Sequence, residues 1–223
     1  MLLTNHNRVI TLLTDKHPAD FDAIRKQLNF DQGIPYDAVW SAEADYLQLL
    51  IDQVFQHQPE QILECGSGFT TLVMAAACRQ VNAGHIFSLE NGAEYAEQTI
   101  QVLKQYDLLE FVTVLDAPLI ETQVGGQTFQ WYSVDQLHAA VAKNTRFGLF
   151  SIDGPPGFLQ KNSRYPALPI MQSYLAQGCV VTLDDAARDD ERALVEQWQK
   201  EFPESRFDYL DYKRGCVIGA FHA

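Results

Sequence analysis

Apolar and polar residues alternate along this chain in blocks that predict strands and helices in turn. Short apolar runs recur, and each is followed by a longer segment with apolar residues at helical spacing. The runs predict strands at 61–65, 85–89, 111–115, 147–152 and 179–183, and the segments after them predict helices at 70–81, 93–106, 134–144, 167–176 and 189–201. Gly178 is placed to end the helix before the last strand. This alternation is typical of an α/β fold in which helices cover both faces of a mostly parallel sheet.

The amino-terminal part of the chain has helical spacing without intervening strands. Residues 19–30 and 42–56 each carry apolar side chains at intervals of three and four positions. These two segments predict a helical cap at residues 1–57. The alternating pattern then predicts a ligand-binding domain at residues 58–223.

Two glycine-containing turns predict β-hairpins. Residues 206–212 and 216–221 flank a Lys-Arg-Gly turn, which predicts an antiparallel hairpin at the end of the sheet. Between the third strand and the next helix, Gly125 and Gly126 predict a tight turn within residues 121–132. The aromatic residues after this second turn either pack on the edge of the sheet or form a flap over a pocket. They are also compatible with a homodimer interface.

The composition narrows the classes of function. A chain of 223 residues is long enough for one α/β domain with a substantial core, but short for two. The formal net charge of −13 argues against a nucleic-acid binder, because phosphate backbones require basic surfaces. The four cysteines are scattered without a CxxC pair, and neither a signal peptide nor a membrane span is evident. We therefore expect a cytoplasmic protein with reduced thiols.

The segment ILECGSGFTT at residues 62–71 indicates a loop for an anionic, nucleotide-like ligand. An apolar strand ends here in an acid and is followed by Gly66 and Gly68, which lack a Cβ and let the backbone approach a ligand closely. The two threonines after them open a helix whose free N–H groups face the ligand. At the end of the next predicted strand, Glu90 is placed to accept hydrogen bonds from ribose hydroxyls.

This loop resembles the first motif of class I S-adenosylmethionine-dependent methyltransferases. The nicotinamide-dehydrogenase pattern requires a third glycine where Thr71 stands, whereas here Glu64 precedes the first glycine. In the methyltransferase family the loop holds the methionine portion of the cofactor, the acid of the second strand holds the ribose, and the end of the third strand contacts the adenine. The resemblance implies that the cofactor is held by Glu64, Gly66, Ser67, Gly68, Thr70, Thr71, Glu90, Asp116, Ala117 and Asp153.

Acidic residues also follow the fourth and fifth predicted strands. Asp153 ends one of them, while Asp184 and Asp185 end the other, so the three carboxylates are expected to converge and are candidate catalytic residues. In metal-dependent enzymes similar to catechol O-methyltransferase, an Asp and an Asp-Asn pair at these strand ends bind magnesium. That resemblance implies a Mg²⁺ site at the same three residues. In the alternative, Asp184 and Asp185 cap the following helix, and Asp153 is the general base for an acceptor hydroxyl.

Two arginines are the cations beside this acidic edge. Arg164 and Arg188 either balance the charge of the carboxylates or bind an acidic acceptor, such as a uronate or a phosphate, through bidentate contacts. Trp131 and Tyr132, at the end of the predicted hairpin, are further candidates for acceptor contact. The run from 152 to 188 resembles a bacterial methyltransferase-domain family often associated with glycan biosynthesis. It is similar, more distantly, to glucuronoxylan O-methyltransferases.

These patterns predict a Rossmann-like seven-stranded sheet with a terminal antiparallel hairpin and helices on both faces. The resemblance implies a methyltransferase that uses S-adenosylmethionine, with Mg²⁺ as a candidate metal, to methylate an oxygen of a small polar acceptor such as a sugar or glycan precursor. We expect no nucleic-acid partner and no membrane span. Two alternatives stay open at this point: an NAD(P)-dependent oxidoreductase, and a non-catalytic nucleotide-binding or scaffold protein with the same fold.

Overall fold

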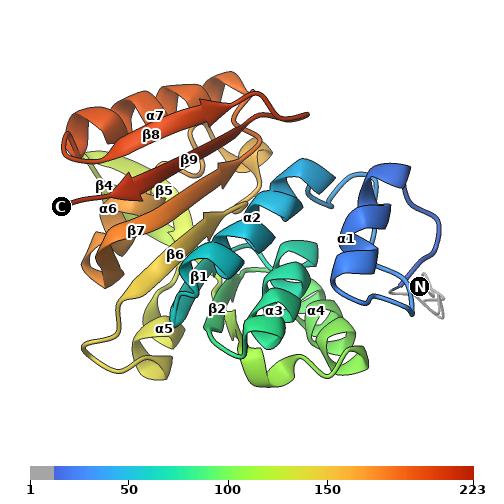
Figure 1. The fold of residues 1–223 in the computed structure, drawn as a ribbon. Coiled ribbons are helices and arrows are strands. Elements are labelled where there is room, and N and C mark those ends of the chain that lie inside the picture. The colour runs from blue at the N-terminus through green and yellow to red at the C-terminus, as the bar shows by residue number, and fades with distance from the viewer. Residues whose placement is uncertain (1–12) are drawn as a thin grey trace, which may run out of the picture.

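A computed structural model describes residues 13–223 of the protein, so the first part of the predicted helical cap, residues 1–12, lies outside the described residues. At the centre is a sheet with the strand order β3-β2-β1-β6-β7-β9-β8 (Figure 1). The strands are β3 (Val112–Asp116), β2 (His85–Glu90), β1 (Gln61–Cys65), β6 (Phe147–Ile152), β7 (Leu175–Asp184), β9 (Cys216–Phe221) and β8 (Arg206–Leu210). The first five of these are parallel, and β9 is antiparallel to both β7 and β8. The predicted sheet with a terminal antiparallel hairpin is confirmed.

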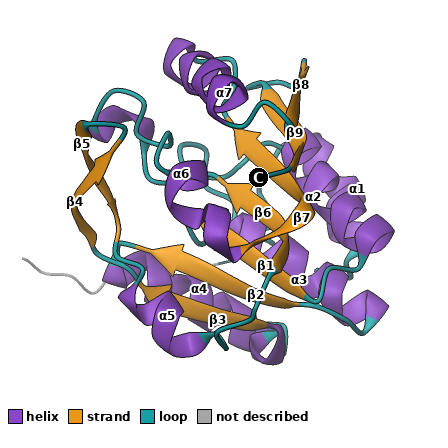
Figure 2. Ribbon diagram, turned by 90° about the vertical axis from the view of Figure 1, so that its left-hand side faces the viewer, coloured by secondary structure: helices purple, strands orange, loops and turns teal. Residues whose placement is uncertain are grey.

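Each face of the sheet buries its own set of apolar side chains, because successive residues of a strand point to opposite sides. In β1, Ile62 packs in the cluster beneath the first helices, whereas Leu63 packs in the cluster on the other face. Helices α2, α3 and α4, with α1 beside them, cover the first face, and α5, α6 and α7 cover the second (Figures 1 and 2). The helices are α1 (Asp22–Gln27), α2 (Ala44–His57), α3 (Phe69–Val81), α4 (Ala93–Gln105), α5 (Asp135–Ala140), α6 (Ala167–Met171) and α7 (Asp189–Glu201).

The structure corrects the predicted helix at 167–176 and the strand after it. Helix α6 ends at Met171, a short 3-10 turn follows at Gln172–Tyr174, and β7 already begins at Leu175. Gly178, predicted to end the helix, lies inside the strand with φ +75° near a shift in the pairing register of β6 and β7. The side chains of Leu175 and Cys179 are buried there. Because the strand places these side chains in the core, it is more stable than a longer helix would be. The predicted helix at 134–144 is likewise shorter, since α5 ends at residue 140.

The predicted hairpin between the third strand and the next helix is present as a separate two-stranded sheet. Strand β4 (Leu119–Val124) pairs antiparallel with β5 (Gln127–Tyr132) around the turn at Gly125 and Gly126, both of which have positive φ. Figure 2 shows this pair standing apart from the central sheet, on the side of α6. Its aromatic residues enter the core of that side, so the packing interpretation of the hairpin is the observed one for Phe129 and Trp131.

Helix α2 packs directly on the sheet. Leu50 and Ile51 are fully buried in the core. The hydroxyl of Tyr46 lies 3.1 Å from both the Ser151 Oγ of β6 and the Thr182 Oγ1 of β7. Helix α2 is therefore part of the layer that covers the sheet, and a division of the chain at residue 57 stays a prediction. Within residues 13–223, no helix is long and apolar enough to cross a membrane.

Candidate active site

The carboxyl ends of β1, β2, β6 and β7 meet at a cavity of about 820 Å³. Its floor includes the glycine loop at residues 66–68 and the segment 153–157 that follows β6. Residues 35–42, the start of α4 and the start of α7 contribute the walls. Small-molecule sites have volumes in this range, and open α/β sheets bind their ligands at this edge. The cavity is therefore the candidate active site.

Glu90 ties the glycine loop to the end of β2. Its Oε2 accepts hydrogen bonds from the backbone N–H and from the hydroxyl of Ser67, each at 2.9 Å, and its Oε1 accepts the N–H of Gly92 at 2.8 Å. Gly66 has φ +90°, a backbone conformation that residues other than glycine rarely adopt, so the turn depends on this residue. The loop and the acid form one hydrogen-bonded unit, and Ser67 and Glu90 both line the cavity.

Glu64 lies beneath the loop. Its Oε2 accepts a hydrogen bond of 2.6 Å from the Thr71 hydroxyl, whose oxygen in turn accepts the N–H of Gly68 at 2.9 Å. The carboxyl group is fully buried. Burial raises the pKa of Glu64 to about 7, although neighbouring hydroxyl groups lower it. Glu64 and Thr71 thus stabilise the turn into α3 from below.

Replacement of Glu64 by Gln is expected to change how stability depends on pH. The pKa of Glu64 is raised in the folded state, so folding favours the protonated form of this carboxyl group. The protonated form therefore adds to the free energy of unfolding at low pH. This stabilisation is lost as the pH rises from the ordinary pKa of 4.5 through about 7. The Gln variant keeps an uncharged acceptor for Thr71. We expect it to gain about 3 kcal/mol relative to wild type between pH 4 and pH 8. Urea unfolding at several pH values measures this difference, with the exposed Glu97→Gln as control. Parallel curves for wild type and Glu64→Gln would contradict the assignment.

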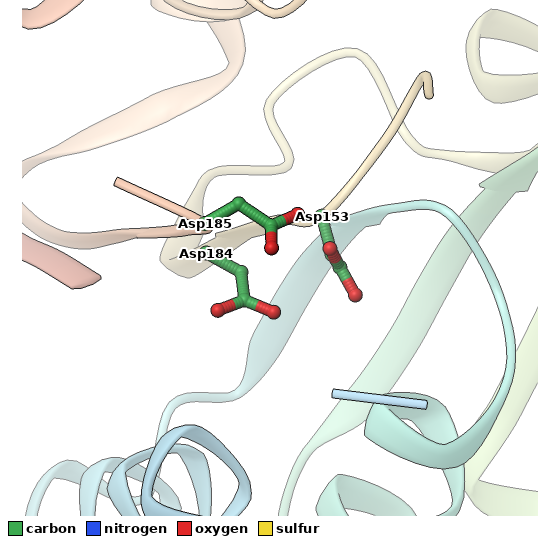
Figure 3. A group of neighbouring side chains, drawn as sticks. All are labelled: Asp153, Asp184 and Asp185. Carbon is green, nitrogen blue, oxygen red and sulfur yellow. The ribbon is translucent and has the colours of Figure 1, made fainter. Parts of the chain in front are cut away.

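Three carboxylates converge beside the glycine loop. Asp153 follows β6, whereas Asp184 ends β7 and Asp185 follows it; each offers one oxygen such that the three lie within 4.8 Å of one another (Figure 3). The side chain of Asp153 is 21% exposed, through the cavity, while Asp184 and Asp185 are buried. Burial raises the pKa of Asp153 to about 6, with Arg164 lowering it and Asp185 raising it. Burial, followed by the charges of Asp153 and Asp185, raises the pKa of Asp184 well above its usual range. The predicted convergence of carboxylates is therefore observed.

Arg164 lies inside this acidic cluster. Its side chain is 3% exposed, and Nη2 lies 3.3 Å from Asp153 Oδ1 and 3.2 Å from Asp185 Oδ2. Burial works against the charge, but the surrounding carboxylates, Asp153 first, raise the pKa of Arg164 above its ordinary value. A magnesium ion held by the same acids would share them with this cation. One feature does suit a cation, since Asp184 Oδ2 is buried without a hydrogen-bond partner.

Two further arginines reach the cluster from its rim. Arg188 Nη1 lies 2.9 Å from Asp185 Oδ2, and Arg214 Nε lies 3.6 Å from Asp185 Oδ1. Arg188 is about half exposed and lines the cavity. Asp185 thus faces three guanidinium groups, and the charge-balancing interpretation of Arg164 and Arg188 is the one that these contacts support. Arg188 also has an exposed side that a ligand can reach.

Tyr132 and Gly154 pack closely at the back of the cavity. A Cβ on Gly154 would clash with the Tyr132 hydroxyl, so this position has no room for a side chain unless Tyr132 moves. Tyr132 lines the cavity, whereas its neighbour Trp131 is fully buried in the core of the second face. Of the two aromatic residues predicted to contact an acceptor, Tyr132 therefore lines the cavity and Trp131 does not, although both rings pack in the same core cluster with centroids 5.2 Å apart.

Three exposed aromatic side chains form the mouth of the cavity. Trp40, Tyr95 and Phe158 come from three different segments and are 53%, 49% and 76% exposed. The Trp40 ring centroid lies 6.2 Å from that of Tyr95 and 6.2 Å from that of Phe158. Their place at the cavity could not be predicted from the sequence, because an exposed aromatic residue has the same local pattern as a buried one. The only signal was the position of Phe158, directly after the Gly-Pro-Pro-Gly turn.

The structure brings most of the predicted residues to the cavity and leaves some outside its lining. Those that line it are Gly66, Ser67, Gly68, Thr70, Glu90, Tyr132, Asp153, Arg164, Asp185 and Arg188. Those outside the lining are Glu64, Thr71, Asp116, Ala117, Trp131 and Asp184. Asp116 is exposed at the end of β3, in register with Glu90, and Ala117 is buried behind it. The ligand contacts of all these residues stay predictions.

Comparison with known proteins identifies the family and the fold. Residues 63–186 match the sequence profile of a methyltransferase-domain family. The fold is similar to the SAH-bound methyltransferase PaMTH1 from Podospora anserina, with 16% identity, a TM-score of 0.63, and coverage of 94% of this chain and 91% of that chain. It is also similar to the O-methyltransferase from Bacillus cereus in complex with SAH, with 13% identity, a TM-score of 0.61 and coverage of 93% of each chain.

A third similar structure is the O-methyltransferase TomG from Streptomyces achromogenes, involved in tomaymycin synthesis and crystallised with SAM. It has 14% identity, a TM-score of 0.61, and coverage of 96% of this chain and 93% of that chain. A search of the curated proteins finds no match. The chain belongs to the methyltransferase-domain family, as a class I S-adenosylmethionine-dependent methyltransferase. The predicted enzyme class is confirmed, and the oxidoreductase alternative is wrong.

Proposed function

We propose that this enzyme transfers the methyl group of S-adenosylmethionine to a hydroxyl oxygen of a small polar acceptor, with a sugar or glycan precursor as the acceptor class. The observation that carries the proposal is Asp153, a carboxylate that reaches the cavity between the glycine loop and the aromatic mouth. A carboxylate in that place can accept the proton that an acceptor hydroxyl loses as its oxygen is methylated.

The cofactor side of the cavity is the glycine loop. We propose that Gly66, Ser67 and Gly68 hold the methionine portion of the cofactor and that Glu90 accepts hydrogen bonds from its ribose. When bound, the cofactor supplies an electrophilic methyl group on sulfur. Gly66 supports this placement, because it lies against the backbone of Gly154 and brings the loop next to Asp153. The acceptor oxygen would then lie between the loop and the carboxylate.

Asp153 is suited to act as the general base near neutral pH. Burial raises its pKa to about 6, so at pH 7 most molecules hold the carboxylate, and its basicity is higher than that of an ordinary Asp. Arg164 Nη2 donates a hydrogen bond of 2.7 Å to the backbone oxygen of Asp153 and also lies 3.3 Å from its Oδ1. These contacts hold the carboxylate in one place while one side stays open to the cavity.

The aromatic mouth supports a sugar-like acceptor. Aromatic rings offer apolar area to the C–H faces of a sugar, while carboxylate and guanidinium groups bond its hydroxyls. Trp40 and Phe158 provide the rings, and Asp153 and Arg188 provide the polar groups around the same cavity. If Arg188 binds a carboxylate of the acceptor, a uronate would be a better substrate than the matching neutral sugar.

Replacement of Trp40 or Phe158 by Ala is expected to raise the acceptor KM about 5- to 50-fold, since each ring loses apolar contact with the acceptor. The affinity for S-adenosylmethionine should change little. The measurement starts with calorimetric titration of S-adenosylmethionine, with NAD as control, and continues with methyl transfer to neutral sugars and uronates. The exposed Ile120, outside the cavity lining, provides the control variant Ile120→Ala. Cofactor binding without transfer to any sugar would reject the acceptor class, and an unchanged KM in both variants would reject the role of the mouth.

A further inference from the structure

We propose that the Arg164 guanidinium is the built-in counter-cation of Asp153, Asp184 and Asp185, so that this site binds no divalent metal ion. This inference rests on the proposed function, because it concerns how the general base of that reaction is held. In this protein, two side chains share the role that a metal ion has in similar cation-dependent enzymes. Arg164 fixes the carboxylate, and Asp153 takes the proton.

The position of Arg164 is the first argument. One nitrogen, Nη2, lies within 3.3 Å of carboxylate oxygens from both Asp153 and Asp185, and the side chain is buried. A hard divalent cation needs these oxygens at roughly 2.0–2.6 Å with its own set of six or more ligands. A guanidinium group that already contacts two of the three acids leaves them facing a cation that cannot be deprotonated. A second, divalent cation would be repelled at this distance.

The anchoring of the guanidinium is the second argument. Arg164 Nη1 donates a hydrogen bond of 2.9 Å to the backbone oxygen of Asp184, and Nη2 donates one of 2.7 Å to that of Asp153. Nε donates to the backbone oxygen of Pro155 at 3.4 Å, and Nη1 lies 4.0 Å from Glu191 Oε1. The planar group therefore bridges the ends of β6 and β7. Movement of Arg164 out of the cluster would leave several buried acceptors without a partner, which is costly.

The surrounding charges are the third argument. Asp185 is contacted by Arg188 and Arg214 in addition to Arg164, so its carboxylate already faces three cations. Asp184 Oδ2 is the one oxygen of the cluster that is buried without a hydrogen-bond partner in the described part of the chain. A divalent cation prefers several oxygen ligands, and for oxygens of Asp153 and Asp185 it would have to compete with the arginines that already contact them. The cluster thus has three acids, as a metal site would, but arginine side chains already balance their negative charge.

The first test is a direct binding measurement on the full chain. Mn²⁺ titration followed by electron paramagnetic resonance, and calorimetric titration of Mg²⁺, should detect no binding to wild type up to about 1 mM, the weak end for oxygen-ligand sites. Arg164→Met, which keeps the apolar stem and removes the charge, should gain Mn²⁺ binding, and Arg164→Met with Asp185→Asn should lose it again. Wild-type binding with a Kd below about 1 mM that Asp185→Asn removes would overturn the proposal.

The variants also allow for loss of folding. Circular dichroism and thermal unfolding establish whether Arg164→Met is folded. If it is not folded, the titration of wild type alone decides whether the site binds a divalent metal ion. A folded Arg164→Met that still binds no Mn²⁺ would overturn the claim that Arg164 excludes the ion. Metal binding is measured without an acceptor. An enzyme that binds no Mn²⁺ and methylates no sugar therefore rejects the proposed acceptor alone.

The positioning role of Arg164 has a kinetic readout of its own. Arg164→Lys keeps the positive charge but loses the fork of donors that bridges the two strand ends. We expect kcat to fall about 10-fold or more with little change in the acceptor KM, and EDTA to leave wild-type turnover unchanged. Equal kcat for Lys and Arg would show that only the charge matters, and loss of wild-type turnover in EDTA that Mg²⁺ restores would overturn the proposal.

Discussion

Replacement of Asp153 by Asn is expected to lower kcat about 10²- to 10⁴-fold, the usual contribution of a positioned general base. Asn has nearly the same shape but cannot accept the proton of an acceptor hydroxyl at any pH in the working range. The affinity for S-adenosylmethionine, measured by titration, should stay within a few-fold of wild type, because the loop and Glu90 are unchanged. Asp189→Asn removes another carboxylate that lines the same cavity, and it should leave kcat near the wild-type value.

The pH dependence of wild type provides an independent check on Asp153. Burial raises its pKa to about 6, and the base works only when deprotonated, so kcat should fall about tenfold per pH unit below that value and level off above it. The Asn variant should lose this acid limb and retain a low, flat rate. A wild-type profile without a limb between pH 5 and pH 7, or an Asn variant with normal kcat, would remove Asp153 from the role of base.

Replacement of Glu90 by Ala is expected to weaken S-adenosylmethionine binding about 10- to 100-fold, because hydrogen bonds to a charged acceptor each contribute roughly 1.5–3 kcal/mol. The substitution removes the carboxylate that we propose accepts hydrogen bonds from the ribose. It also releases Ser67 and Gly92, whose N–H groups now bond the carboxylate. Calorimetric titration of S-adenosylmethionine and S-adenosylhomocysteine measures the loss.

Two further variants separate the effects of Glu90. Ser67→Ala removes one of the bonds that hold the loop but keeps the ribose acceptor, so it should weaken binding only a few-fold. The exposed Glu94→Ala, on the first turn of α4, should have no effect. If Ser67→Ala and Glu90→Ala weaken binding equally, Glu90 acts through the loop rather than on the ribose. Unchanged affinity in Glu90→Ala would reject both interpretations.

Much of the fold could be predicted because each strand of the sheet is a short apolar run with turn residues at its ends. Strands β1, β2, β3 and β6 lie within one residue of their predicted positions. Glu90, Asp153 and Asp184 fall at strand ends, where parallel strands bring them to one edge. Local patterns were sufficient for these features, because burial on both faces requires an apolar run. The start of β7 was missed, since residues 167–176 satisfy helical spacing as well and tertiary packing decided between the two.

The candidate site was predicted less completely, because its contacts join segments that are distant in the sequence. Sequence placed Arg164 beside the acidic edge but could not show that its guanidinium group enters the cluster and bonds the carbonyl groups of Asp153 and Asp184. Trp40 and Phe158 meet only because the loop before α2 folds over the segment after β6. Local periodicity has no information on such pairs.

The contacts of Arg214 have a consequence for the order in which the site can form. The bond between Ser67 and Glu90 joins residues 23 positions apart, so the cofactor loop can assemble soon after β2 has been synthesised. Arg214, in the turn between β8 and β9, donates to the carbonyl oxygen of Ser41, next to Trp40, across 173 positions. The N–H of Lys213 likewise bonds Asp45 at the start of α2. A nascent chain can therefore form its glycine loop early, whereas the aromatic mouth of the cavity has to wait for the hairpin, since contacts between distant segments form late.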